Sequence, residues 1–123
     1  MSELRQDAMF SYFDERIASC ERKREALLKD DRADEAVFER IRANVYDIFK
    51  AMLRVSVKAG GGEEKAVRRF FLEKVEEIPV SWEESCRKAE QHGDVEKVRI
   101  ETIKLETVKG IRAAFGRIWE AQP

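Results

Sequence analysis

Apolar side chains recur at steps of three, four and seven residues through four long stretches of the chain. Because an α-helix has about 3.6 residues per turn, this spacing gathers the side chains on one helix face. The second stretch shows it most fully, in a main stripe formed by Val37, Ile41, Val45, Ile48, Met52 and Val55. No stretch alternates apolar and polar residues for long enough to indicate a strand. The pattern predicts four helices, near residues 3–29, 34–58, 63–91 and 94–120.

The breaks between these stretches carry residues that begin or end helices. Asp34 and Asp94 stand where a side chain would cap the following helix. Gly60, Gly61 and Gly62 predict a flexible linker near the midpoint of the chain. Short polar turns elsewhere join each helix pair into an antiparallel hairpin. We therefore predict an all-α fold, an antiparallel up-down-up-down four-helix bundle in one domain (residues 1–123) that consists of hairpin 1–59, the linker 60–62 and hairpin 63–123.

Pro79 conflicts with the third predicted helix. A proline inside a helix removes a backbone hydrogen bond and costs about 3 kcal/mol. One outcome is that the helix stops near Ile78 and restarts at Ser81, which begins a capping-box sequence. The other is a continuous helix with a kink, because the apolar stripe keeps its phase from Ile78 to Trp82. We predict a kinked or briefly interrupted helix that keeps its direction.

The second predicted helix is apolar over more than one face. Beside its main stripe runs a seam of large side chains interrupted by one cation, which consists of Phe38, Arg42, Tyr46, Phe49 and Leu53. Such width is typical of the most central helix of a monomer, and also of a helix that contacts a partner subunit. In the second interpretation these five residues form the interface of a homodimer, because two-fold dimers are the commonest oligomers.

Charge and composition exclude several classes of protein. The chain has 24 Lys and Arg against 25 Asp and Glu, so its net charge is −1. That balance provides no field to attract nucleic acid or an anionic membrane surface. Charged residues interrupt every apolar stretch well before the roughly 20 residues that a membrane span requires. The first residues lack the apolar core of a signal peptide and the two cysteines are isolated, so we expect a cytoplasmic protein.

Candidate chemistry is sparse in this chain. The one histidine, His92, lies six residues from Cys86, or about 9 Å along a helix, which is too far for a catalytic pair. No Glu-x-x-His motif offers the ligands of a di-metal bundle. The three glycines lack the preceding strand and the Lys-Ser/Thr of a phosphate-binding loop. We therefore predict no catalytic residue, no metal site and no cofactor, and hence no enzyme.

The sequence favours a non-enzymatic interaction module, a scaffold or regulator that forms a homodimer or binds another protein. An alternative is a bundle that senses a small apolar molecule, because aromatic side chains can wall a pocket inside a helix bundle. Pro79 beside Trp82 would open a gap between helices, and Phe71 belongs to the same apolar stripe. The predicted pocket of this alternative therefore consists of Trp82, Pro79 and Phe71.

Overall fold

The protein is helical apart from short turns in a computed structural model that describes residues 2–120. Its elements are α1 (Ser2–Lys29), α2 (Ala33–Gly60), α3 (Glu64–Gln91), α4 (Val95–Phe115) and a π-helical turn, Gly116–Glu120. The prediction of four helices in an all-α fold is confirmed, with bounds that differ by a few residues from those predicted. Residues 1 and 121–123, at the ends of the predicted domain, lie outside the described residues.

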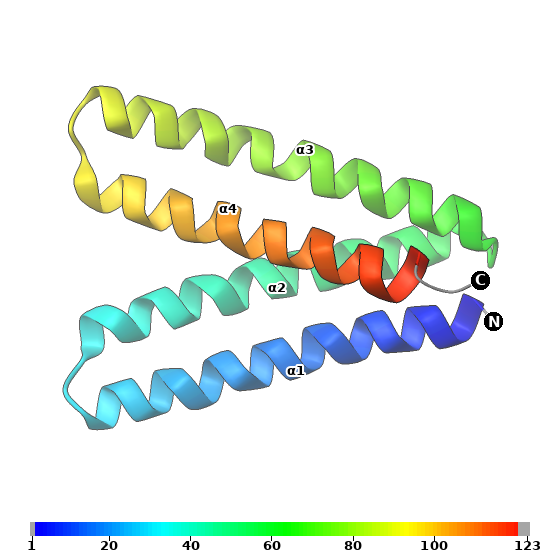
Figure 1. Ribbon diagram of the computed structural model, residues 1–123, viewed down its shortest axis with the longest axis horizontal. Helices are drawn as coiled ribbons and strands as arrows, with labels where there is room; N and C mark the ends of the chain where they lie inside the picture. Colours follow the sequence, from blue (N-terminus) through cyan, green and yellow to red (C-terminus); the bar gives the residue numbers. More distant parts are fainter. Residues whose placement is uncertain (1, 121–123) are drawn as a thin grey trace.

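The helices run alternately in opposite directions, which confirms the predicted up-down-up-down bundle (Figure 1). The α1–α2 and α3–α4 turns lie at one end of the molecule, and the α2–α3 turn lies at the other (Figure 1). α2 packs against all three other helices, whereas α1 meets α4 only weakly. At that meeting point the Tyr12 hydroxyl donates a hydrogen bond to the Gly110 carbonyl oxygen at 3.4 Å. The two hairpins therefore diverge toward the end that carries their turns (Figure 1).

Aromatic rings from all four helices form the centre of the core. Phe71 of α3 contacts Phe13 of α1, Phe49 of α2 and Phe115 of α4, with ring centroids 6.4, 6.5 and 4.8 Å away. All four side chains are at most 1% exposed. Trp119, in the π-helical turn, stacks on Phe115 at 5.1 Å and is buried as well. Burial of this apolar surface is the main force that holds the helices together.

The turn between α2 and α3 is tighter than the predicted linker. Gly60 belongs to α2 and is buried. A Cβ atom there would lie 2.5 Å from Cγ2 and 2.9 Å from the backbone nitrogen of Val67. Gly61 and Gly62 have φ angles of 56° and 87°, in the left-handed region that favours glycine. The prediction of a three-glycine linker is thus corrected to a turn that begins at Gly61, with Gly60 permitting close contact between α2 and α3.

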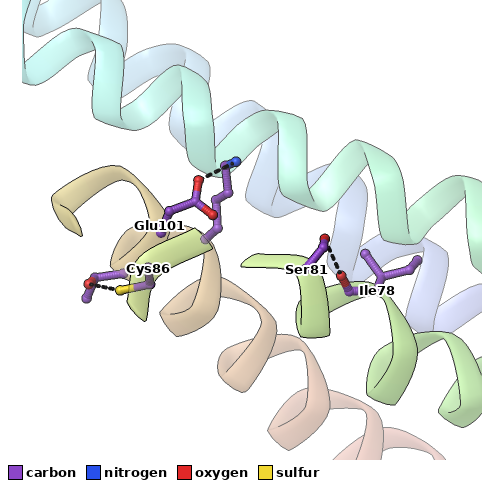
Figure 2. A network of polar contacts seen from close by, with 6 residues as sticks. Ile78, Ser81, Cys86 and Glu101 are labelled. Carbon is purple, nitrogen blue, oxygen red and sulfur yellow. Dashed lines mark hydrogen bonds and ion pairs between the residues drawn. The ribbon is translucent and has the colours of Figure 1, made fainter. Parts of the chain in front are cut away.

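α3 runs without a break through Pro79. Ser81 lies inside the helix, and its hydroxyl donates to the Ile78 carbonyl oxygen at 3.5 Å instead of capping a new helix (Figure 2). The predicted interruption therefore does not occur, and the kink stays a prediction. Pro79 is buried, so its packing offsets part of the lost backbone hydrogen bond.

The predicted caps are confirmed at one helix start and wrong at another. Asp94 caps α4, because its Oδ1 accepts a hydrogen bond from the Lys97 backbone nitrogen at 3.1 Å. Asp34 lies within the first turn of α2, and Arg32 occupies the N-cap position instead. An acidic side chain in the first turn still interacts favourably with the helix dipole, so Asp34 stabilises the same helix by another route.

Candidate functional site

The structure separates the five residues of the predicted interface into two groups. Phe49 and Leu53 are fully buried in the core. Phe38, Arg42 and Tyr46 are half-buried, in the half of α2 nearest its turn with α1. The seam as a whole faces inward, so only its first three residues are accessible to a binding partner.

The main stripe of α2 is partly exposed. Val37, Ile48 and Val55 are 50%, 39% and 52% exposed, whereas Val45 is buried. These three residues lie outward because the adjacent seam carries larger side chains, each of which buries more apolar area when it faces inward. An apolar row therefore remains on the outer face of α2.

The accessible part of the seam borders a cavity at the tip of the α1–α2 hairpin. This tip cavity measures about 460 Å³, which is within the range of ligand-sized sites. α1, α2 and their turn supply its lining, which consists of Lys23, Ala26, Leu27, Arg32, Glu35, Phe38, Glu39 and Arg42. Apolar carbon, cations and carboxylates therefore meet in one place.

Two of the three cations in the lining are paired with carboxylates of the same cavity. Arg42 Nη1 lies 2.6 Å from Glu39 Oε2, and Arg32 pairs with Glu35. The hydrogen bond of the second pair raises the pKa of Arg32 and lowers the pKa of Glu35. The Arg32–Glu35 pair is about half exposed, so solvent screens it and it contributes little to stability. Breaking the Arg32–Glu35 pair therefore costs little free energy, so both side chains can form new ion pairs with a bound partner.

Further cations around the cavity have no carboxylate partner. Lys23 lines the cavity and forms no ion pair within the described residues. Arg99 of α4 reaches the same place, because its Cζ lies 5.8 Å from the ring centroid of Phe38. Arg16, two helical turns from Lys23 on the same face of α1, lies 5.8 Å over the ring of Tyr12. The region thus carries three cations without an ion pair among the described residues, near the half-buried rings of Phe38 and Tyr12.

Cys20 lies next to this region and is chemically protected. Its side chain is 6% exposed. Burial, assisted by the negative charge of Glu39, raises the pKa of the Cys20 thiol. A raised pKa keeps the thiol protonated, and a protonated thiol is a poor nucleophile. Cys20 is therefore a poor nucleophile at neutral pH.

Tyr46 lies at the inner edge of the same region, where its ring meets Tyr12 edge-on at 6.2 Å. Burial raises the pKa of Tyr46 to about 12. Because an unfolded tyrosine ionises near pH 10, Tyr46 contributes stability below about pH 10 that is lost as the pH rises toward its folded pKa.

We expect Tyr46→Phe and the wild type to give the same tyrosinate absorbance up to about pH 11. A smaller signal from the variant below that pH, with helix content intact, would mean that Tyr46 is solvated.

The three residues of the predicted aromatic pocket lie in different surroundings. Phe71 is fully buried at the centre of the core. Pro79 lines a groove of about 430 Å³ between α3 and α4, and neither Phe71 nor Trp82 belongs to its lining. Trp82 meets Phe49 edge-on at 6.4 Å. The small-molecule alternative stays a prediction, with Pro79 as the member of the trio that borders this groove.

A charged pair from α4 lies over Trp82. Oε1 of Glu101 accepts a hydrogen bond from Lys104 Nζ at 2.9 Å (Figure 2), and Nζ lies 5.4 Å from the ring centroid of Trp82. The Glu101 side chain is 6% exposed, and Oε2 has no hydrogen-bond partner among the described residues. A buried carboxylate without a cation would be strongly destabilising, so Lys104 is what permits Glu101 to lie here.

Metal-ligating groups do not converge in the described part of the chain. There, no three His, Cys, Asp or Glu side chains are placed to hold a metal ion. His92 is exposed at the C-cap of α3. Sγ of Cys86 lies 4.0 Å from Oε1 of Glu90 (Figure 2) and 3.9 Å from Oγ1 of Thr102. None of the described helices combines the length and apolarity that a membrane crossing would need.

Three residues of the candidate site were missed from the sequence: Arg16, Lys23 and Arg99. Lys23 belongs to the basic run at residues 22–24, which is visible in the sequence but is flanked by glutamates. No sequence pattern indicates that Arg99, from the last helix, lies over Phe38. Comparisons of the chain with known protein families, with curated proteins and with solved structures find no match.

Proposed function

We propose that the protein is a non-enzymatic interaction module whose tip cavity binds an acidic, amphipathic helix of a partner protein. The observation that carries this proposal is a set of cations without carboxylate partners among the described residues: Lys23 in the cavity lining, Arg99 over the accessible ring of Phe38, and Arg16 over the ring of Tyr12 two helical turns along α1. Aromatic and cationic side chains are enriched where protein partners bind most tightly. Unpaired cations also attract an acidic partner and raise its rate of association.

The shape of the region favours a helix as the ligand. α1 has little contact with α4, and the two hairpins diverge toward the end that carries the tip cavity (Figure 1). Arg16 and Lys23 are spaced about 10 Å apart along α1, a distance that matches two turns of a partner helix. Apolar residues between two such turns would contact Phe38 and Leu27, as in other complexes where a helix lies in a groove.

The carboxylates in the lining favour a protein over nucleic acid. Glu35 and Glu39 lie among the cations of the tip cavity. Regularly spaced phosphates would meet these carboxylates and be repelled, whereas a helix can present neutral residues opposite them.

Both cysteines are free, which supports a location in the cytoplasm, where thiols stay reduced.

Charge reversal tests the proposed site. In Lys23→Glu/Arg99→Glu we expect affinity for the partner to fall by about tenfold or more, because two attractive charges become repulsive. A photoreactive phenylalanine analogue at position 38 would capture the partner in cells of the native source, and mass spectrometry would identify the attached peptide. The expected peptide is rich in Asp and Glu, with apolar residues at helical spacing.

The matched control is Lys65→Glu/Arg117→Glu, which reverses two exposed cations near the opposite end of the molecule. It makes the same change in net charge and should retain binding. Equal loss in both double variants would indicate a general charge effect. Cross-linking of nucleic acid at position 38, or of basic peptides alone, would contradict an acidic helix as the ligand.

A further inference from the structure

The outer face of α2 exposes a row of β-branched side chains. Val37, Ile48 and Val55 are three of the six exposed large apolar residues in the described part of the chain. Ile41 is half-buried and extends the row, because Ile41, Ile48 and Val55 follow one another at seven-residue intervals. Single exposed apolar residues are normal, but several aligned on one helix face are typical of a surface that another chain covers.

Seven-residue spacing is the repeat by which two helices pair. Ile41, Ile48 and Val55 occupy one core position of that repeat, and Asn44 and Ala51 occupy the other. In an antiparallel pair a bulky residue faces a small or polar one, so Ile48 would meet Ala51 of the partner subunit and Val55 would meet the partner's Asn44. In a parallel pair bulky residues would face each other and Asn44 would face itself, which fills space less evenly.

Two charges beside the row also favour the antiparallel arrangement. Asp47 and Arg54 are exposed, lie seven residues apart on the same flank of α2, and have no ion-pair partner within the described residues. In the antiparallel register Asp47 lies beside Arg54 of the partner subunit, and the symmetry repeats the pair. In a parallel pair the two residues stay about 10 Å apart along the axis and do not meet.

We propose that two copies of the chain form an antiparallel dimer through the outer face of α2, about a two-fold axis near the middle of that helix. A two-fold interface requires a surface that complements itself, and this one does so both in side-chain volume and in charge. This outer face of α2 is a different surface from the seam of α2 that the sequence analysis offered as a homodimer interface. It is also separate from the tip cavity, which lies on the flank of α2 that pairs with α1, so neither proposal depends on the other.

Sedimentation velocity over a concentration series tests the dimer and its register. The wild type is expected to be dimeric in the high-micromolar range. Asp47→Arg and Arg54→Asp each place like charges together at two symmetric positions, so each should weaken the dimer by about tenfold or more. A mixture of the two variants should restore the dimer, because every pair then joins an arginine to an aspartate. The double variant Asp47→Arg/Arg54→Asp should restore it as well.

Two controls separate this interface from general effects. Glu73→Arg changes the charge as Asp47→Arg does, at an exposed position of α3, and should leave the dimer intact. Lys23→Glu/Arg99→Glu should also leave it intact, because the tip cavity is a separate site. A wild type that stays monomeric throughout would overturn the proposal. A dimer that ignores both charge reversals, or variants that do not recover on mixing, would overturn it too.

Discussion

Replacing Phe71 with alanine is expected to lower the free energy of unfolding by about 3–5 kcal/mol. Phe71 is fully buried, and its ring contacts one ring on each of the other helices, Phe13, Phe49 and Phe115. Truncation removes apolar area and leaves a cavity where all four helices meet. The surrounding rings belong to four separate helices, so they cannot close the cavity without moving those helices. The loss is a large fraction of the about 5–15 kcal/mol that stabilises a typical domain.

Urea unfolding followed by circular dichroism measures this effect. The matched control is Val80→Ala on the same helix, because Val80 is 56% exposed and its truncation should change stability by at most about 0.5 kcal/mol. Phe71→Leu keeps most of the volume and provides a folded comparison if Phe71→Ala does not fold. Similar midpoints for Phe71→Ala and Val80→Ala would mean that the aromatic centre is not the main support of the core.

The start of α4 and the turn after α2 could be predicted because they depend on local chemistry. Asp94 caps α4 through a neighbouring backbone nitrogen, and Gly61 and Gly62 take positive φ angles that favour glycine. Both features depend on residues a few positions apart. Trp119 was harder to place, because regular helical spacing puts it at the edge of the last helix face. The π-helical turn changes that spacing and brings it into the core.

The inward face of α2 could not be fixed by periodicity. The main stripe and the seam are both apolar at helical spacing, so either could face the core. Side-chain volume decides between them, because Phe49 and Leu53 bury more surface than Val37 and Val55.

The candidate site depends on tertiary structure more than the fold does. Phe38 and Arg42 were indicated by the seam, since they are neighbours on one helix face. Lys23 and Arg99 come from the first and last helices, and they approach Phe38 only because both pack on α2. Their lack of carboxylate partners is likewise a property of the folded chain. A balanced composition of 24 basic and 25 acidic residues conceals such local excess.

Gly60→Ala is expected to destabilise the protein by about 1–3 kcal/mol, although alanine is the better helix former. The new methyl group would lie 2.5 Å from Cγ2 and 2.9 Å from the backbone nitrogen of Val67. The Val67 side chain is fully buried and has no free space to rotate into, and its backbone is the first turn of α3. α2 and α3 must therefore separate at the turn, which disturbs the packing of both.

The same substitution at Gly110 is the matched comparison, with the opposite sign expected. Gly110 lies inside α4, is exposed, and would place a Cβ atom with no neighbour within 4 Å. There alanine only lowers the conformational entropy of the unfolded chain, so Gly110→Ala should stabilise the protein by about 0.5–1 kcal/mol. Thermal unfolding of both variants measures the contrast. A stabilised Gly60→Ala would mean that the α2–α3 contact is looser than the structure indicates, since backbone propensity alone predicts the same sign at both positions.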